Sequence, residues 1–422
     1  MTVIGLDDTD SRTRGMCTTY VANRVADRLR ESGATVRRIL LVRLNPAVEF
    51  KTRGNAALAI HTTAGLESAA RVAREELDAA AEVDDPRTNP GLVVAPGAPE
   101  SVPDEVASFA RNALRDIIPV ERAAELADAA GYATAGWKNA QGLVGALAAV
   151  GAWAAFDDWT YEHISYREPE AWGTEREIDY DSLFAAADEC YPETWDTVDR
   201  AEGEAVCVPH TPCPILFGIR GDDPDACRQL AASIDAEPVH DDALFVTNQG
   251  TDAHLAPGEL GSLEDDRAYR VDGVVATEPE TKRGGHVFFE LESGESAIQC
   301  AAFEPTKRFR DRVRALRVGD RLTVSGEVGD GTLKLEKFAV RELQTTELVT
   351  PTCPDCGRTM KSAGRNQGYR CRDCGTNSSG KVETEVERDL ELGWYEVPPC
   401  ARRHVAKPLV RGGFDATVHP ER

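Results

Sequence analysis

Apolar and polar residues alternate with two different periods along the first 260 residues. Short apolar runs of strand length stand between longer stretches in which apolar residues recur every three or four positions, as on one face of a helix. This alternation predicts an α/β or α+β fold. The expected strands are 2–8, 35–44, 56–63, 159–167, 214–221 and 243–250, and the expected helices are 18–32, 66–82, 103–118, 120–130, 179–191 and 222–234.

The helical period disappears between about residues 268 and 343. Short strand-like segments separated by glycine turns follow one another there, at 269–276, 286–293, 296–304, 320–328 and 332–343. About five strands in so short a stretch favour a small barrel, and the usual barrel of this size is the oligonucleotide-binding OB fold. The alternative is an all-β adaptor domain that is not an OB fold.

The chain is strongly acidic. Its 422 residues, enough for three or four domains, carry 72 Asp and Glu against 48 Lys and Arg, for a formal charge of −24. Lysine is scarce among the basic residues, which suggests a halophilic cytosol, where concentrated salt screens charge repulsion over about 3 Å at 1 M. The acidity therefore does not exclude a nucleic-acid partner.

The sequence carries no sign of export or membrane insertion. The N-terminus lacks a basic-then-apolar leader, and the longest apolar run is too short and too rich in glycine to span a bilayer. We expect a soluble, cytoplasmic protein without a membrane partner. The oligomeric state cannot be predicted.

Four cysteines near the C-terminus have the spacing of a metal site. Cys353, Cys356, Cys371 and Cys374 form two C-x-x-C pairs. Each pair can chelate one ion from a tight turn, and four thiolates complete the tetrahedron of a closed, structural zinc site. The other cysteines are scattered singly, which is typical of a reducing compartment. The sequence therefore predicts a zinc ribbon and C-terminal tail in 350–422.

Three carboxylates follow the first apolar run. Asp7, Asp8 and Asp10 are followed, after three further residues, by "RGMCTTY", which supplies a glycine and two hydroxyls at an expected helix start. Carboxylates after a strand can hold Mg²⁺, and a helix N-terminus favours anions, so this junction is typical of a phosphoryl-transfer site. A solvated turn is the alternative.

Known nucleotide-binding signatures do not account for this junction. The sequence contains no G-x-x-x-x-G-K-S/T, which excludes a P-loop enzyme. The haloacid-dehalogenase pattern requires Thr or Val four residues after a nucleophilic Asp8, where Arg12 stands.

Further candidate residues lie in three loops. Lys51 and Arg53 precede a strand in a glycine-containing loop and could clamp phosphates, although ordinary surface charges are equally consistent with the pattern. A second group enters a helix of small residues, where glycine permits close approach to a ligand or to another element: Lys138, Asn139, Gly142 and Gly145. A third polar cluster ends a strand: Asn248, Gln249, Thr251 and Asp252.

These motifs, in this order, resemble the archaeal agmatidine synthetases of the TiaS family nearly end to end. The resemblance rests on "GLDDTDS…GMCTTY", "LVRLNP…KTRGNAA", "GLVGALAAVGA", "LFGIRG", "TNQGTDAH" and the terminal ribbon. The chain departs from the family pattern at Gln141, where an Arg is common, and at Cys213, where an acidic residue is expected.

The resemblance implies four domains. They are a kinase-like ATP-binding catalytic domain at 1–160, a ferredoxin-like domain at 161–262, an OB fold at 268–343 and the zinc ribbon with its tail at 350–422. It also implies an ATP-dependent C–N ligase that attaches agmatine to the wobble cytidine of isoleucine tRNA, so that the anticodon reads AUA.

The resemblance further implies the roles of single residues. ATP is consumed to AMP and phosphate, the 2-carbonyl oxygen of the cytidine is phosphorylated, and the amine of agmatine then attacks the ring. The family's autophosphorylated threonine matches Thr18, and Asp7, Asp8 and Asp10 would hold Mg²⁺ and catalyse the transfer. The loops with Lys51, Arg53, Lys138, Asn139, Gly142 and Gly145 would bind ATP; Asn248, Gln249 and Asp252 are weaker candidates for substrate binding.

Two other functions are consistent with parts of the sequence. An OB fold with a zinc ribbon could be a non-catalytic adaptor that binds single-stranded nucleic acid, but an adaptor has no use for the carboxylates and Thr18. A small-molecule kinase with an RNA-binding tail would turn over ATP without tRNA and release ADP.

Overall fold

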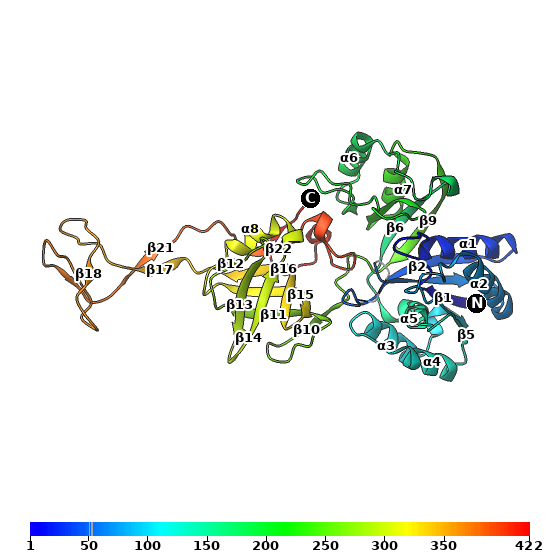
Figure 1. Ribbon diagram of the computed structural model, residues 1–422, viewed down its shortest axis with the longest axis horizontal. Coiled ribbons are helices and arrows are strands. Elements are labelled where there is room, and N and C mark those ends of the chain that lie inside the picture. The colour runs from blue at the N-terminus through cyan, green and yellow to red at the C-terminus, as the bar shows by residue number, and fades with distance from the viewer. Residues whose placement is uncertain (50, 52–53) are drawn as a thin grey trace.

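The computed structural model describes residues 1–49, 51 and 54–422. Figure 1 shows three parts along the longest axis of the molecule: an α/β part with helices on both faces of a sheet, a central barrel, and a small outlying ribbon. Arg53, one of the expected phosphate contacts, lies outside the described residues. Among the described residues, no helix combines the length and apolar character needed to cross a membrane.

One nine-stranded sheet forms the centre of the α/β part. Its strands run in the order β5-β4-β1-β3-β2-β9-β6-β8-β7. The parallel pairing of β2 with β9, in which Leu40 lies opposite Val246, joins the first half of the sheet to the second. The strands are β1 Thr2–Asp7, β2 Val36–Arg43, β3 Ala56–Thr62, β4 Gly91–Pro96, β5 Ala133–Gly136, β6 Thr160–Arg167, β7 Thr194–Trp195, β8 Ile215–Gly221 and β9 Val239–Thr247.

Helices cover both faces of this sheet. Ile4 and Leu6 of β1 belong to the core beneath α1 and α2, whereas Val3 belongs to the core beneath α3, α4 and α5. A Cβ on Gly5 would lie only 2.0 Å from the carbonyl oxygen of Ala146, so the small residues of α5 bring that helix very close to β1. The helices are α1 Thr18–Glu31, α2 Leu66–Ala80, α3 Asp104–Ala113, α4 Val120–Ala129, α5 Gly142–Ala155, α6 Tyr180–Glu189 and α7 Pro224–Ala232, with 3₁₀ turns Pro99–Ser101 and Pro169–Ala171.

A closed five-stranded barrel follows. The pairings β11-β13, β13-β14, β14-β16, β16-β15 and β15-β11 close the ring. This closure and the apolar interior confirm the expected OB fold. The elements are β11 Arg267–Val275, β13 Val287–Ser293, β14 Ser296–Ala302, α8 Phe309–Arg314, β15 Arg321–Gly329 and β16 Thr332–Glu342, with β10 Leu255–Pro257, β12 Glu280–Thr281 and the turn Glu304–Thr306 beside them.

The zinc ribbon stands away from the barrel on a two-stranded stalk (Figure 1). The stalk consists of β17 Thr346–Val349 and β21 Val382–Glu385, and the ribbon contains β18 Lys361–Ser362, β19 Tyr369–Arg370 and β20 Asn377–Ser378. The ribbon has a core of only Cys353, Met360 and Cys371, with Tyr369 against it. A core this small needs an additional source of stability, such as a bound metal ion.

After the ribbon, the chain returns to the other two parts. Strand β22 Gly393–Glu396 pairs with β16 of the barrel. Residues 397–411, which we call the return segment, then contact the α/β part: the backbone N–H of Gly250 donates to the carbonyl of His404, and that of Thr251 to Val405. The last elements are the turns Pro399–Ala401 and Leu409–Arg411 and strand β23 Val418–His419.

Candidate catalytic site

A cavity of about 430 Å³ opens at one end of the central strands of the nine-stranded sheet. Strands β1, β2 and β9 end on this side of the sheet, and β3 and β6 begin there. The cavity is lined by the acidic residues that follow β1, by the N-termini of α1 and α5, by the ends of β2 and β8, and by the return segment. It therefore brings together residues from both ends of the chain.

The acidic loop, residues 7–11, forms one wall. Asp7, Asp8 and Asp10 all line the cavity. Asp8 has a left-handed backbone (φ 58°), and Asp7 accepts a hydrogen bond from its N–H at 2.7 Å. Burial, assisted by the charge of Asp8, holds the pKa of Asp7 well above its ordinary value, and burial also raises the pKa of Asp8 to about 6. Burial thus disfavours the ionised form of these two carboxyl groups, and a cation in the cavity would favour it.

A second segment, residues 82–89, holds the acidic loop in place. The N–H of Asn89 donates to Asp8 at 2.8 Å, and the hydroxyl of Thr88 donates to the carbonyl of Asp10 at 2.6 Å. Lys138 in turn donates to the carbonyls of Asp85 and Thr88. Lys138 is exposed and is not among the cavity-lining residues, so its contacts in the structure support the loop.

The other side of the acidic loop contacts the start of α1. Thr18 is the first residue of this helix, is 6% exposed and lines the cavity. Its hydroxyl oxygen accepts a hydrogen bond from the hydroxyl of Thr9 at 3.1 Å. The first backbone N–H groups of a helix have no partner within it, so this end of α1 offers donors for an anion in the cavity.

The glycines of α5 allow the helix to approach the acidic loop. A Cβ on Gly145 would lie 1.9 Å from a carboxyl oxygen of Asp7, and one on Gly142 would lie 2.5 Å from the N–H of Gly91 in β4. Both glycines line the cavity, as does Gln141 at the helix start. Asn139 is exposed and accepts from the N–H of Gln141, which fixes the turn before α5. Close packing and access to the cavity thus both require glycine here.

Lys51 also lies at the cavity, where its amine donates to the carbonyl of Pro46. Burial and the charge of Arg403 lower the pKa of Lys51. The structure therefore places the described member of the expected phosphate-binding pair at the cavity wall.

A network of polar side chains forms another wall of the cavity. Gln249 accepts from Arg43 at 3.2 Å and donates to the carboxylate of Glu162. Asn248 exchanges two hydrogen bonds with the backbone of Arg43, at 2.7 and 3.1 Å. Arg43 and Glu162 line the cavity, and the two amides orient them from behind. Sequence analysis selected the two amides but not Glu162. The only local signal for Glu162 is its place in the alternating polar and apolar pattern of β6.

Asp252 lies outside this wall. It accepts from Lys337 of the barrel at 2.8 and 2.9 Å and from the N–H of Lys407 at 2.6 Å. Lys337 is 1% exposed, so this is a buried ion pair between two parts of the molecule. Asp252 is not among the cavity-lining residues.

The return segment completes the cavity with residues that sequence analysis did not select. Arg402 is 8% exposed and pairs with Asp196 and with Glu396. The side chain of His404 opens on the cavity, where the charge of Arg43, with burial and Arg220, holds its pKa well below the ordinary value. The local signal was weak: three cationic or titratable residues in "CARRHV", far from any other motif.

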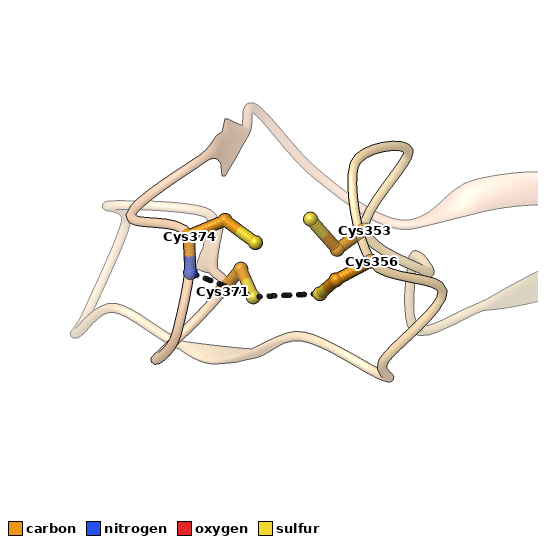
Figure 2. Close-up of side chains that lie close together, drawn as sticks. All are labelled: Cys353, Cys356, Cys371 and Cys374. Atoms are coloured by element: carbon orange, nitrogen blue, oxygen red, sulfur yellow. Dashed lines mark hydrogen bonds between the residues drawn. The ribbon is translucent and has the colours of Figure 1, made fainter.

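The four cysteines of the ribbon converge (Figure 2). Their sulfur atoms all lie within 4.8 Å of one another, and those of Cys356 and Cys371 are 3.6 Å apart. Tetrahedral zinc with bonds of about 2.3 Å requires sulfurs about 3.8 Å apart. Burial alone would raise the pKa of Cys353, but backbone N–H groups and the neighbouring thiols lower it to about 7, which favours the thiolate. The donor set fits a structural zinc ion.

The fold and the site define a class of protein: an enzyme with an acidic catalytic cavity joined to nucleic-acid-binding modules. Family models match four segments of the chain: the TiaS TCKD domain at 3–74, the TiaS FLD domain at 140–254, an OB-fold nucleic acid binding domain at 269–342 and the TiaS C-terminal zinc ribbon domain at 350–390.

Whole-length relatives agree with these matches. The chain is 54% identical to the isoleucine-tRNA 2-agmatinylcytidine synthetase TiaS of Haloquadratum walsbyi, over 100% of both proteins. It superposes on a crystal structure of a complex of TiaS with its isoleucine tRNA and ATP with a TM-score of 0.90 at 41% identity, covering 100% of this chain and 99% of that one. For a complex with tRNA, AMPCPP and agmatine the values are 0.88 and 39%, with the same coverage. The chain belongs to the TiaS family.

The division at residue 160 stays a prediction. One sheet runs through both expected domains, and the FLD match begins at residue 140, ahead of that position.

Proposed function

We propose that this chain conjugates agmatine to position 2 of the wobble cytidine of isoleucine tRNA, with consumption of ATP, so that the anticodon reads AUA. A C–N bond to the amine of agmatine forms, the bond from the ring carbon to the phosphorylated oxygen breaks, and phosphate leaves with that oxygen. The observation that carries this proposal is a single cavity that unites the acidic loop, Thr18 and polar walls in a chain similar over its whole length to TiaS synthetases.

The acidic loop is the proposed site of Mg²⁺. Asp7, Asp8 and Asp10 line the cavity, and burial raises the pKa values of the first two, so that a bound cation would stabilise their ionised form. Oxygen ligands of this kind suit Mg²⁺, which supplies charge neutralisation for a triphosphate when bound.

Thr18 is the proposed acceptor of phosphate from ATP. Its hydroxyl lies at the N-terminus of α1, beside the acidic loop. Donors of the helix end would face the transferred phosphate. Lys51, Gly142 and Gly145, which line the same cavity, are proposed to contact ATP. Lys138 and Asn139 would contribute by holding the loops around it.

The wall with Glu162 is the proposed site for a cationic group of agmatine. Agmatine carries an amine and a guanidinium, so it needs carboxylates or carbonyl oxygens. Glu162 is 7% exposed and faces the cavity, held by Gln249. Asn248 and Gln249 are then positioning residues, whereas Asp252, occupied by Lys337, would act through the contact between the parts.

The barrel and the ribbon are proposed to bind the tRNA. An OB fold offers a surface for single-stranded nucleic acid, and the ribbon presents Lys361, Arg370 and Arg372 on its exposed surface. A non-catalytic adaptor is not supported, because the catalytic part matches TiaS models. The proposed location is the cytoplasm, where tRNA is modified.

The test is mass spectrometry of the wobble nucleoside after incubation of the protein with isoleucine tRNA, ATP and agmatine at high salt. We expect agmatidine and AMP only when all three substrates are present. Thr18→Ala should abolish the product while tRNA still binds in a filter assay, and Thr18→Ser, which keeps the hydroxyl, should retain part of the activity. Full activity of Thr18→Ala would exclude the proposed role of Thr18.

A further inference from the structure

Thr9 is a buried hydroxyl at the centre of the acidic loop to which the proposed chemistry gives no role. Its side chain and backbone are 0% exposed. Its hydroxyl donates to the hydroxyl oxygen of Thr18 at 3.1 Å, and its carbonyl accepts from the N–H of Glu82 at 3.0 Å. A buried hydroxyl costs free energy unless it is hydrogen-bonded, and Thr9 meets that need through the oxygen of Thr18.

The loop holds Thr9 rigidly on both sides. Asp8 before it accepts from the N–H of Asn89, and the carbonyl of Asp10 after it accepts from Thr88. The segment that provides these partners is itself fixed by Lys138. The backbone that carries Thr9 is thus anchored on both sides, and the Thr9 hydroxyl donates from this anchored position to the hydroxyl of Thr18, which can turn about its own Cα–Cβ bond.

A threonine in a helix populates two χ1 rotamers, because its hydroxyl can bond to a carbonyl of the preceding turn. Thr18 is the first residue of α1, so no preceding helical turn fixes its choice. The hydrogen bond from Thr9 selects the rotamer in which the Thr18 oxygen faces the acidic loop. It occupies one lone pair of that oxygen and leaves another for a reacting atom.

We propose that Thr9 is a positioning residue for phosphoryl transfer to Thr18. The inference rests on the proposed role of Thr18 and adds to it. In the transfer, the Thr18 oxygen forms a bond to the terminal phosphorus of the nucleoside triphosphate, and the bond from that phosphorus to the bridging oxygen breaks, with its electron pair kept by the departing nucleotide. The Thr18 proton passes to a carboxylate oxygen of the acidic loop. Thr9 keeps its own proton throughout and holds the Thr18 oxygen in line with the phosphorus–oxygen bond that breaks.

The test compares Thr9→Val, which keeps the shape of the side chain and removes the hydroxyl, with Thr9→Ser, which keeps the hydroxyl. Phosphate on Thr18 is followed by phosphopeptide mass spectrometry after mixing with ATP, without tRNA. We expect Thr9→Val to slow phosphorylation of Thr18 about tenfold, the equivalent of one hydrogen bond, with the KM for ATP changed less than twofold. Thr9→Ser should recover at least half of the rate.

The matched control is Thr2→Val. Thr2 lies in β1 far from the cavity, is 2% exposed and donates to the carbonyl of Ala64 at 2.7 Å. This variant loses a buried hydrogen bond of the same kind, so it should lower Tm about as much as Thr9→Val and leave phosphorylation unchanged.

The outcomes separate this inference from the proposed function. Phosphorylation of Thr18 at the normal rate in Thr9→Val overturns the positioning role. If Thr9→Val raises the KM for ATP but leaves the maximal rate of Thr18 phosphorylation unchanged, the positioning role is also overturned, because that result would assign Thr9 to nucleotide binding. Phosphate found on Thr9 of the unaltered protein would make Thr9 the acceptor and contradict it too. Absence of phosphate from Thr18 in the unaltered protein refutes the proposed function itself.

Discussion

Burial acts on single ionisable side chains far from the cavity as well as within it. His61 in β3 is 0% exposed, and neither ring nitrogen has a hydrogen-bond partner among the described residues. Burial, with the charge of Arg38, lowers the pKa of His61 to about 3. The ring of Trp153 packs edge-on against it at 5.9 Å. The folded protein therefore holds a neutral imidazole in an aromatic and aliphatic setting.

This setting makes stability depend on pH. In the unfolded chain, His61 takes up a proton below its ordinary pKa of about 6.5, whereas in the folded chain it stays neutral down to about pH 3. The unfolded state thus binds more protons, and stability falls as the pH drops through this window. His61→Phe should remove this pH-dependent loss of stability. The free energy of unfolding of His61→Phe, relative to that of the unaltered protein, should therefore rise by about 2 kcal/mol between pH 8 and pH 5.

Urea denaturation at the two pH values measures this difference. Leu348→Phe is the control, because Leu348 is 61% exposed and carries no titratable group, so its replacement should give the same free-energy difference at both. An advantage of His61→Phe that does not change with pH would show that the neutral imidazole is not the cause.

At the scale of elements, the ribbon is the part whose folding depends most on a single group, its structural zinc ion. Its core contains few side chains, and the two strands of its stalk pair with each other over only four residue pairs. Structural zinc in such a module supplies much of the folding free energy. The barrel, in contrast, closes around a continuous apolar core that includes Phe289, Phe309 and Phe338.

Cys371→Ala should therefore unfold the ribbon and leave the rest folded. We expect bound zinc to be lost and tRNA affinity to fall at least tenfold, while ATP binding is unchanged. Zinc content and filter binding of tRNA and of nucleotide measure these effects. Cys190→Ala, which removes a buried thiol at the end of α6, should keep the zinc. Equal tRNA retention by Cys371→Ala would remove the ribbon from tRNA binding.

Local sequence pattern predicted most elements, because periods of two and 3.6 residues are visible within one segment. It missed β4, the second strand of the sheet, whose six residues pair with β1, because Pro90 precedes this strand and Pro96 ends it, which gives the pattern of a loop. It also gave no sign that the sheet continues from β2 to β9, since that pairing joins residues some two hundred positions apart.

The same distinction applies to the site. The acidic loop, the hydroxyls at the start of α1 and the glycines of α5 were predicted because they stand in short motifs whose chemistry is local, and the resemblance to the TiaS family singled out Thr18 among those hydroxyls. Glu162 and His404 were not, because their meaning comes only from the cavity they share with that loop. The predicted roles of Asn248 and Gln249 stay predictions, and their contacts now connect them to Arg43 and Glu162.

At the scale of the whole molecule, buried ion pairs join the parts. Arg402 bridges Asp196 of the α/β part and Glu396 of β22, and Lys337 of the barrel reaches Asp252. All of these side chains are at most a tenth exposed. Removing one member of such a pair leaves charge buried and unpaired, which costs more than the pair itself contributes.

Arg402→Met should thus lower the free energy of unfolding by about 3–5 kcal/mol and impair modification of the tRNA, because its neighbours line the cavity. Arg402→Lys, which keeps the charge, should recover part of both. The exposed pair Arg71–Glu75 is the control: Arg71→Met should cost less than about 1 kcal/mol. Chemical denaturation and the nucleoside assay measure these changes, and a loss below 1 kcal/mol for Arg402→Met would contradict the structural account.

The position of the return segment has a consequence for synthesis of the protein on the ribosome. The cavity wall includes Pro399, Cys400, Arg402 and His404, yet these residues are translated after the sheet, the barrel and the ribbon. A nascent or truncated chain that stops before them has its acidic loop and Thr18 but an incomplete enclosure. Completion of the cavity therefore waits until the last part of the chain has been synthesised.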